Sequence, residues 1–331
     1  MYKIQLESLE DFHNFLNSTD SDWISVYAED NFMTFIMATS EIATLYQASC
    51  ISNTESKKDL FRIKRVVLKN CVKSSVIYLD VQSDRVNIKT VSLAGSLIEA
   101  NTVKHAEYLN NIQKYFGIAR NVKSHTTFNA MPLHKPVEIA KLYGSFVEVS
   151  KGICGVTSKD TTRIFNEVPN IPDLALTPAG AFMLFKCNYM WSAIENYICA
   201  SNNSFLVIIT QCRGTGTVDD YFDILRVGGS ALEATIDLAE VIGTSNRLKD
   251  PRISYNFRIN TCTLTSGDDI YTVSVPTVKV QISEKYDKDS LNLNTKMICG
   301  LLSKMKTSIV SLAVKKYFNI LKIDGMTVVF K

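Results

Sequence analysis

Three short stretches of this 331-residue chain share one pattern, and this repetition constrains the fold more than any other feature of the sequence. The stretches are Phe35–Ser40, Asp173–Pro178 and Thr261–Ser266, each an apolar or β-prone run that ends in a threonine and a turn-forming residue. Another strand-like run is expected two to four residues after each of them. Self-similarity at a long period changes the architecture that a chain can adopt. The pattern predicts a molecule built of three related parts.

Apolar residues recur at helical spacing in six segments, which the sequence predicts as helices lying on sheets. The segments are 8–16, 60–73, 137–149, 188–199, 231–243 and 295–306. Strand pairs are predicted after the second, fourth and sixth helices, at 75–81 and 84–90, at 204–210 and 220–227, and at 309–314 and 320–330. The predicted unit is a half-domain of one helix and several strands, present six times in three pairs. Segment 103–136 fits no unit and is predicted as an extended connection with local structure.

Composition narrows the classes of protein that the chain can belong to. A formal charge of +3 means that any affinity for nucleic acid must come from locally clustered charge. No apolar run reaches the length of a membrane span, and the acidic N-terminal segment argues against secretion. Cys50, Cys71, Cys199, Cys262 and Cys299 lie in apolar segments, as expected of buried, reduced thiols. We therefore expect a cytoplasmic location.

Motifs of catalysis are missing from the sequence. There is no phosphate-binding Gly-x-x-x-x-Gly-Lys-[Ser/Thr] loop and no Gly-x-Gly-x-x-Gly after a strand. The histidines His13, His105, His125 and His134 have no spacing typical of a metal site. We expect a non-enzymatic protein without a cofactor or a metal.

Six predicted half-domains paired into three domains give the chain a resemblance, over nearly its whole length, to a known family, and the last stretch is the closest match. Segment 290–294, a helix, two strands and the terminal Thr327–Phe330 look like the end of the third domain of the bacterial DNA sliding clamp, the beta subunit of the replicative DNA polymerase. Ala239–Asn246, followed by the strand 252–257, looks like the start of that domain, and Leu174–Thr177 sits where clamps carry a strand and turn. The chain is short for the bacterial type, which suggests a divergent or viral (phage) version. The resemblance therefore implies the cytoplasm of a bacterium or of an infected host cell.

The resemblance implies an α+β clamp fold with helices inside a ring and sheets outside. It implies three domains at 1–122 (with the extended connection from about 103), 123–228 and 229–331. Two subunits would form a homodimeric ring around double-stranded DNA, bound without sequence specificity. The ring would act as a processivity factor that tethers DNA polymerase and is placed by a clamp loader.

Basic residues at helical spacing support contact with DNA. Arg62, Arg65, Lys69 and Lys73 are three, four and four residues apart, and predict a basic stripe on the second helix. An ordinary solvated helix face is the alternative interpretation. The sixth helix adds Lys296, Lys304 and Lys306 as DNA-facing candidates.

Two further sites follow from the resemblance alone. It implies a hydrophobic peptide-binding pocket formed by Thr177, Phe182, Leu321, Ile323, Val328 and Phe330. It implies a dimer interface that uses Val86 and Ile88 in one subunit and Val241 and Ile242 in the other. Core packing is the alternative for Ile323 and Val328.

Two other classes of protein remain open at this point. One is a clamp-like replication or transcription accessory factor that works as a monomer or trimer and does not encircle DNA. The other is a viral structural or assembly protein whose basic helix is merely solvated.

Overall fold

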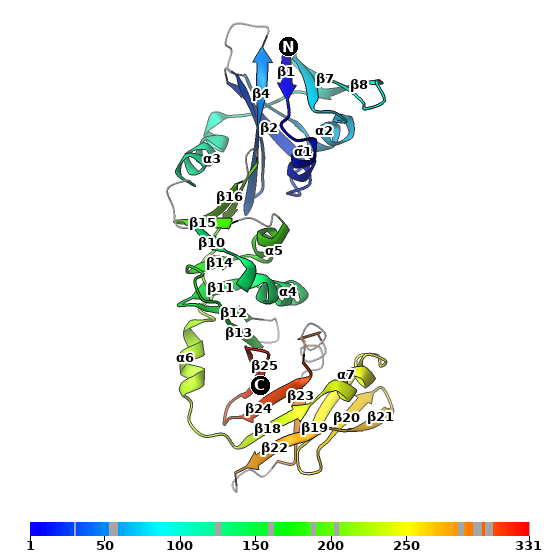
Figure 1. Cartoon of the computed structure of the whole chain (residues 1–331), viewed down its shortest axis with the longest axis vertical. Coiled ribbons are helices and arrows are strands. Elements are labelled where there is room, and N and C mark those ends of the chain that lie inside the picture. Colours follow the sequence, from blue (N-terminus) through cyan, green and yellow to red (C-terminus); the bar gives the residue numbers. More distant parts are fainter. Residues whose placement is uncertain are drawn as a thin grey trace. The chain divides into compact units, whose positions relative to one another are not determined.

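The computed structural model describes residues 1–331 except 30, 53–58, 123–126, 158–161, 187–189, 202–204, 284–287, 294–299, 302–306 and 331 (Figure 1). The fold divides into two compact units. Unit 1 contains Met1–Met131 and Ala179–Cys212, and unit 2 contains Pro132–Pro178 and Arg213–Lys331. The predicted domain divisions near residues 122 and 228 stay a prediction. Among the described residues, no helix combines the length and the apolar character that a membrane crossing needs.

Unit 1 is built on one sheet of thirteen strands, in the order β10-β15-β16-β17-β4-β1-β6-β7-β8, with β2, β3, β5 and β9 branching from this path. Its strands are β1 (Tyr2–Gln5), β2 (Trp23–Glu29), β3 (Phe32–Ala38), β4 (Ile42–Ser52), β5 (Asp59–Lys64), β6 (Val76–Val81), β7 (Arg85–Val91), β8 (Leu97–Val103), β9 (His105–Ala106), β10 (Thr127–Asn129), β15 (Met190–Ile194), β16 (Tyr197–Ser201) and β17 (Phe205–Thr210). Its helices are α1 (Leu9–Leu16), α2 (Arg65–Cys71), α3 (Leu109–Asn121) and α5 (Pro178–Lys186), of which α5 begins at the last residue of a unit 2 segment.

Unit 2 holds a nine-stranded sheet in the order β14-β11-β12-β13-β26-β25-β24-β18-β22 and a four-stranded sheet in the order β21-β20-β19-β23. The strands are β11 (Val147–Ser150), β12 (Ile153–Thr157), β13 (Arg163–Glu167), β14 (Leu174–Leu176), β18 (Leu232–Asp237), β19 (Arg252–Asn256), β20 (Thr261–Ser266), β21 (Asp269–Ser274), β22 (Thr277–Ile282), β23 (Ser290–Leu293), β24 (Ile309–Val314), β25 (Asn319–Ile323) and β26 (Met326–Phe330). The helices are α4 (His134–Tyr143), α6 (Asp219–Arg226) and α7 (Ala239–Ser245), and a 3₁₀ turn, η2 (Met131–Leu133), precedes α4.

Helix α1 confirms the first predicted helix. Ser8 caps it, since the amide of Asp11 donates to Ser8 Oγ at 3.1 Å. Phe12 and Phe15 are fully buried, and the Phe12 ring lies edge-on to Tyr46 at 5.0 Å between centroids. The short helix is therefore held by burial of one aromatic face against β4.

The second and fifth predicted helices are each wrong in their first half. Residues 60–64 belong to β5, and α2 begins at Arg65. In the fifth, Leu232, Ala234 and Ile236 are buried alternately in β18, and only then does α7 begin. Period-two burial places these residues on one face of a strand, a pattern that short apolar runs share with helices.

The fourth predicted helix, 188–199, is wrong in its described part. Its residues form the hairpin β15–β16, in which Ser192 lies opposite Cys199. Glu195 closes the turn with a φ of 44°, a left-handed conformation that ends a strand. The helix of this region precedes the hairpin, as α5, and starts at Pro178 because proline fits the first turn of a helix. The strand expected two to four residues after the stretch Asp173–Pro178 is therefore wrong, because α5 occupies these residues.

Three more predictions differ from the structure or fall outside it. The third helix ends at Tyr143, where Gly144 takes a left-handed conformation, and 147–150 is a strand. The segment 220–227 is α6, not a strand, and 103–136 contains α3. The sixth predicted helix, 295–306, lies outside the described residues except at Gly300 and Leu301, which are helical.

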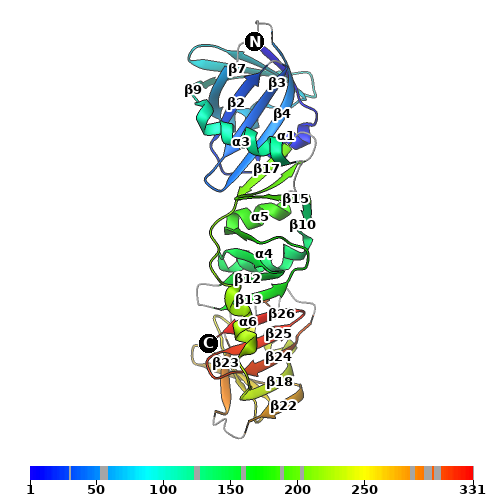
Figure 2. The same cartoon turned by 90° about the vertical axis from the view of Figure 1, so that its left-hand side faces the viewer.

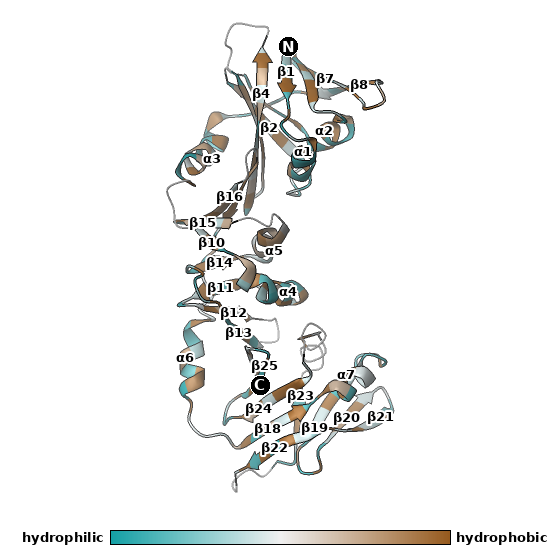
Figure 3. Ribbon diagram, in the orientation of Figure 1, coloured by the Kyte–Doolittle hydropathy of each residue, from teal (hydrophilic) through white to brown (hydrophobic). Residues whose placement is uncertain are grey.

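The predicted strands at 75–81, 84–90, 204–210 and 309–314 are confirmed as β6, β7, β17 and β24. The predicted strand 320–330 is the hairpin β25–β26, which turns at Asp324 and Gly325. Hydrophobic residues concentrate on strands such as β4 and β24, and hydrophilic residues mark α4 and parts of α6 (Figure 3). The four described cysteines that we predicted as buried, Cys50, Cys71, Cys199 and Cys262, are buried free thiols. Cys299 lies outside the described residues.

Candidate functional sites

The four basic residues predicted as one helical stripe lie in two different settings. Arg62 lies on β5, and its guanidinium carbon is 5.1 Å from the centroid of the Trp23 ring. Arg65 opens α2, and its Nη1 donates to the backbone oxygens of Leu16 and Thr19. Both arginines are therefore used in part by the fold. Lys69 on α2 and Lys73 just beyond it are exposed.

Arg62 also belongs to a polar cluster at β2, β5 and β9. Ser25, opposite Arg62 in the sheet, donates from Oγ to Glu107 Oε2 at 2.5 Å. Burial raises the pKa of Glu107, but hydrogen bonds from Ser25, Asn111 and the Tyr108 amide, together with the charge of Arg62, outweigh it and lower this pKa overall. The Glu107 carboxylate is thus held ionised, and the nearby charge of Arg62 contributes to this, although Arg62 Nε itself is buried without a hydrogen-bond partner among the described residues.

The other three DNA-facing candidates, Lys296, Lys304 and Lys306, lie outside the described residues. No group of three or more His, Cys, Asp or Glu side chains that could hold a metal ion occurs in the part of the chain that the structure describes.

Four of the predicted peptide-pocket residues share one face of the hairpin β25–β26. Leu321 lies directly opposite Val328, and Ile323 and Phe330 follow at even spacing on the same face. All four are buried, with exposed fractions of at most 3%. Thr177 is half-buried after β14, and Phe182 on α5 is 45% exposed.

The opposite face of the hairpin is covered by α6, which the sequence-based interpretation missed. Ile320 and Val329 pack there in one cluster with Phe165 of β13 and with Tyr221 and Ile224 of α6. The signal was present in the sequence, because Val218, Tyr221 and Ile224 recur every three residues. Asp219 and Asp220 also stand in the first turn, where the helix dipole favours acidic residues.

A loop hydrogen-bonded to the sheet sets the position of α6. Glu148 Oε2 on β11 accepts from the amides of Thr215 and Thr217 at 3.1 and 3.0 Å. Gly155 on β12 lets the loop come close, because a Cβ there would lie 3.0 Å from side-chain carbons of Thr217 and Val218. The loop that leads into α6 is therefore held at both Glu148 and Gly155.

The predicted interface residues lie mostly inside the units. Val86 and Ile88 on β7 are fully buried, and Val241 on α7 is 1% exposed, while Ile242 is half-buried. The exposed apolar residues lie one strand further out, on β8, where Leu97 and Val103 are each 61% exposed. Strand β8 ends the path of the thirteen-stranded sheet, so one of its edges has no neighbouring strand among the described residues.

Comparison with known proteins identifies the fold. No protein-family model matches the chain, and no curated protein matches its sequence. Among solved structures, the DNA polymerase III subunit beta from Pseudomonas aeruginosa has a TM-score of 0.68 at 11% identity, over 100% of this chain and 99% of that chain. A putative beta subunit from Eubacterium rectale has a TM-score of 0.69 at 12% identity, with the same coverage. The beta clamp of Helicobacter pylori, solved bound to a DNA ligase peptide, has a TM-score of 0.60 at 13% identity, over 99% of this chain and 98% of that chain. The chain therefore has, along its whole length, the α+β fold of the bacterial DNA polymerase III beta subunits, the sliding clamps.

Proposed function

We propose that this chain is a DNA polymerase processivity factor, a sliding clamp that closes as a homodimeric ring around duplex DNA. The observation that carries the proposal is the likeness to bacterial beta subunits over 100% of this chain and 99% of those chains. Because a shared fold does not by itself fix a function, the experiment below tests the role directly. The proposed role is non-enzymatic, and it requires a topological link to DNA, not a catalytic site.

The proposed contacts with DNA are sequence-independent. Lys69 and Lys73 are exposed at α2 and would reach phosphates, whereas Arg62 and Arg65 would contribute charge from more fixed positions. Contacts to phosphates carry no sequence information and give an affinity that falls with salt. Such contacts suit a ring that must slide. Lys296, Lys304 and Lys306 remain candidates for the same role.

The proposed ring needs two different surfaces on each subunit that are complementary to each other. Strand β8 offers an unpaired edge with exposed Leu97 and Val103, and an open edge of this kind pairs readily with another chain. We place the unit 1 side of the dimer interface at β8, with Val86 and Ile88 supporting it from the adjacent strand. Helix α7, with Val241 and Ile242, remains the proposed partner side.

The proposed peptide site lies at the C-terminal hairpin. The H. pylori clamp was solved with a DNA ligase peptide, so peptide binding is compatible with this fold. In our chain Leu321, Ile323, Val328 and Phe330 would form its apolar floor, with Thr177 at its border. Peptides of the polymerase and of a clamp loader are the proposed occupants.

The topological link can be tested directly. Subunits are mixed with nicked circular plasmid at a dilution that separates dimers, then concentrated so that rings close again, and protein that co-elutes with DNA is measured before and after the plasmid is cut once. We expect a mass of twice 37.1 kDa by light scattering and release of the bound protein when the circle is cut. A strict monomer, or retention that is equal on cut and uncut DNA, would exclude the encircling ring in favour of a non-encircling factor. A dimer that is never retained on circular DNA would instead support an assembly role.

A further inference from the structure

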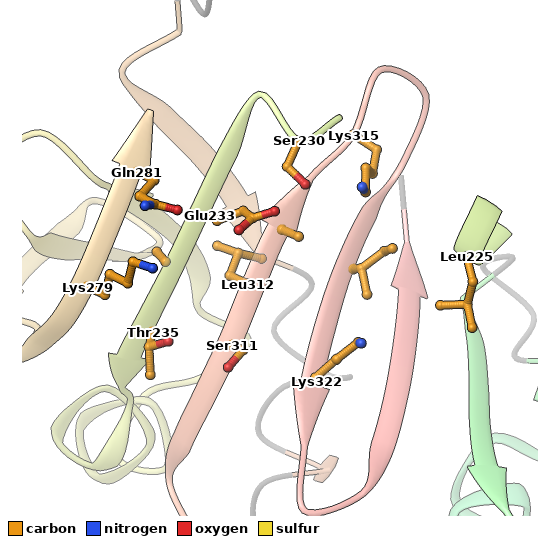
Figure 4. A pocket seen from close by; sticks show the side chains of 13 residues that line it. Leu225, Ser230, Glu233, Thr235, Lys279, Gln281, Ser311, Leu312, Lys315 and Lys322 are labelled. Atoms are coloured by element: carbon orange, nitrogen blue, oxygen red, sulfur yellow. The ribbon is translucent and has the colours of Figure 1, made fainter. Parts of the chain in front are cut away.

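Unit 2 contains a groove on the face of the nine-stranded sheet, with a cavity volume of about 360 Å³ (Figure 4). Strands β22, β18, β24 and β25 form its floor, and Leu225 near the end of α6 lies at one side. Figure 2 shows these strands side by side with α6 in front of the neighbouring strands β13 and β26. The groove thus begins next to the part of the nine-stranded sheet that α6 covers.

The strand register explains which side chains meet in the groove. One row across the sheet runs Gln281, Glu233, Ala313 and Ile320, and the next runs Lys279, Thr235, Ser311 and Lys322. Directly opposed residues of neighbouring strands point to the same face. On the floor of the groove, the polar row that contains Lys279 and Lys322 therefore lies beside a row of two polar residues, Gln281 and Glu233, and two apolar ones.

The groove carries an excess of positive charge. Lys279, Lys315 and Lys322 line it, against the single carboxylate of Glu233. The ion pairs between described residues involve none of these three lysines. Like charges held this close on one surface raise the local concentration of anionic partners.

A second cavity continues the positive charge beyond the groove. It is lined by Lys288, Lys315 and Lys316 and has a volume of about 670 Å³. Because Lys315 lines both cavities, the basic surface extends along the turn between β24 and β25.

Two further features show what kind of anion would fit. The Ser230 hydroxyl is buried at the lip of the groove and has no hydrogen-bond partner among the described residues, which leaves a donor for a ligand. The 42% exposed Leu225 and the half-buried Ala313 offer an apolar patch beside the lysines. An occupant therefore needs both acidic groups and an apolar side chain.

We propose that this groove, defined by Lys279, Lys315, Lys322, Glu233, Ser230 and Leu225, docks an acidic peptide segment that carries an aliphatic side chain, supplied by a partner protein. Charge complementarity favours an acidic chain. The central Glu233 and the apolar patch disfavour a phosphate backbone, which has negative charge at every step and no apolar side chain. The proposal does not depend on ring closure or on DNA binding.

The test uses the full-length protein and fluorescence anisotropy. The probe is a fluorescein-labelled peptide of alternating glutamate and leucine, compared with the same peptide in which glutamine replaces every glutamate. We expect saturable binding of the glutamate peptide that weakens with salt, and weaker binding of the glutamine peptide. The double variant Lys279→Glu/Lys322→Glu should weaken the glutamate peptide roughly five- to thirtyfold, because two attractive surface contacts become repulsive.

Lys249→Glu is the matched control, since Lys249 is an exposed lysine of unit 2 that lines neither cavity. It should bind the peptide as the unchanged protein does, and circular dichroism verifies that all variants are folded. Equal binding of the glutamine peptide, or no loss in the double variant, overturns the proposal. Displacement of the probe by oligothymidylate, with loss of oligothymidylate binding in the double variant, assigns the groove to nucleic acid and also overturns it.

Discussion

Glu148 and Thr215 are joined twice, because the same carboxylate oxygen, Oε2, accepts from the Thr215 amide at 3.1 Å and from its hydroxyl at 2.8 Å. The Thr217 amide adds a third hydrogen bond to that oxygen at 3.0 Å. A single side chain of β11 thus organises the loop that leads into α6. The loop is 67 residues away in sequence, so this contact closes a long segment of chain.

Replacing this carboxylate should loosen the loop before it affects the sheet. We expect Glu148→Ala to lower the free energy of unfolding by about 1–2 kcal/mol, as amides that were paired with a charged acceptor lose it. Amide exchange at Thr215 and Thr217 should accelerate, measured by hydrogen exchange. Glu167→Ala, at an exposed glutamate of β13 in the same sheet, is the control and should leave both amides protected. Unchanged exchange in Glu148→Ala would show that the loop is held by other contacts.

Two glycines should respond in opposite directions to a larger side chain. Gly155→Val should lower the free energy of unfolding by about 1–3 kcal/mol, because its Cβ would press on Thr217 and Val218 at 3.0 Å. Gly117→Ala, in the middle of α3 with nothing within 4 Å of the new Cβ, should raise it by about 0.5–1 kcal/mol. Urea unfolding measures both. A stable Gly155→Val would mean that the loop before α6 can move outward without cost.

Contact with DNA should depend on exposed lysines more than on the fixed arginines. Lys69→Glu/Lys73→Glu should weaken binding to duplex DNA and reduce the slope of log K against log salt by roughly 2, as two phosphate contacts are lost. Fluorescence titration at several salt concentrations gives the slope. Lys3→Glu, an exposed lysine on β1, makes the control. If the slope of the double variant equals that of the unchanged protein, α2 does not face DNA.

Arg62→Glu tests the contribution of Arg62 to the stability of unit 1. Its guanidinium lies over Trp23 and beside Glu107, so reversal of its charge should destabilise unit 1 as well as change DNA binding. Thermal unfolding should therefore separate it from the lysine variants, which should keep the melting temperature of the unchanged protein. If Arg62→Glu, Lys69→Glu/Lys73→Glu and the unchanged protein have equal melting temperatures, the contacts of Arg62 contribute no stability.

Self-association should be sensitive to β8. Leu97→Lys/Val103→Lys places two charges on the exposed apolar residues of this edge strand, and we expect the dimer mass in light scattering to fall to the monomer mass at micromolar concentration. Ile51→Lys, at a residue of unit 1 that is 64% exposed, should leave the mass unchanged. An intact dimer in the β8 variant would move the interface elsewhere.

Alkaline pH should destabilise the protein through its buried thiols. Burial raises the pKa of Cys199 and Cys262 to about 12 from the ordinary 9.0, and burial with a hydrogen bond to Asp59 raises the pKa of Tyr2. Between pH 9 and 12 the folded thiols keep protons that the unfolded chain has lost, so the free energy of unfolding falls as pH rises. Each thiol contributes at most about 1.4 kcal/mol per pH unit.

Urea unfolding at pH 7, 9 and 10 measures this slope. Cys262→Ala should make the decline between pH 9 and 10 shallower, because one of the linked protons is removed. A free energy of unfolding that does not change above pH 9 would mean that the thiols ionise equally in the folded and unfolded chain.

The elements that the sequence predicted correctly are those marked by a helix cap or by strict alternation of apolar and polar residues. Ser8 with Asp11 located α1, and the alternating residues of β6, β7 and β24 located strands correctly. The errors fall on short segments, such as β18 and β15–β16, in which apolar residues fit both periods and neighbouring strands decide the outcome. Helix α6 was missed because Tyr221, Phe222 and Ile224 read as a β-prone run unless the two preceding aspartates are weighed.

Site residues were harder to place, because exposure depends on neighbours that sequence does not reveal. Val86 and Ile88 looked like interface residues, but β8 pairs beside them and carries the exposed apolar side chains instead. Arg62 looked like a surface cation, but the pairing of β5 with β2 brings Trp23 close to it and the pairing of β5 with β9 brings Glu107 close.

The interleaving of the two units has a consequence for the order in which the chain can fold during synthesis. Strand β17, at residues 205–210, completes the centre of the unit 1 sheet by pairing with β4. Strand β26, near residue 330, lies between β13 and β25 in the unit 2 sheet. Most of the chain must therefore leave the ribosome before either sheet can be completed. Until then, the strands synthesised earlier have unpaired edges. The sheets of this protein therefore depend on late, long-range pairing, which leaves strand edges of the nascent chain open to other chains until most of it has been synthesised.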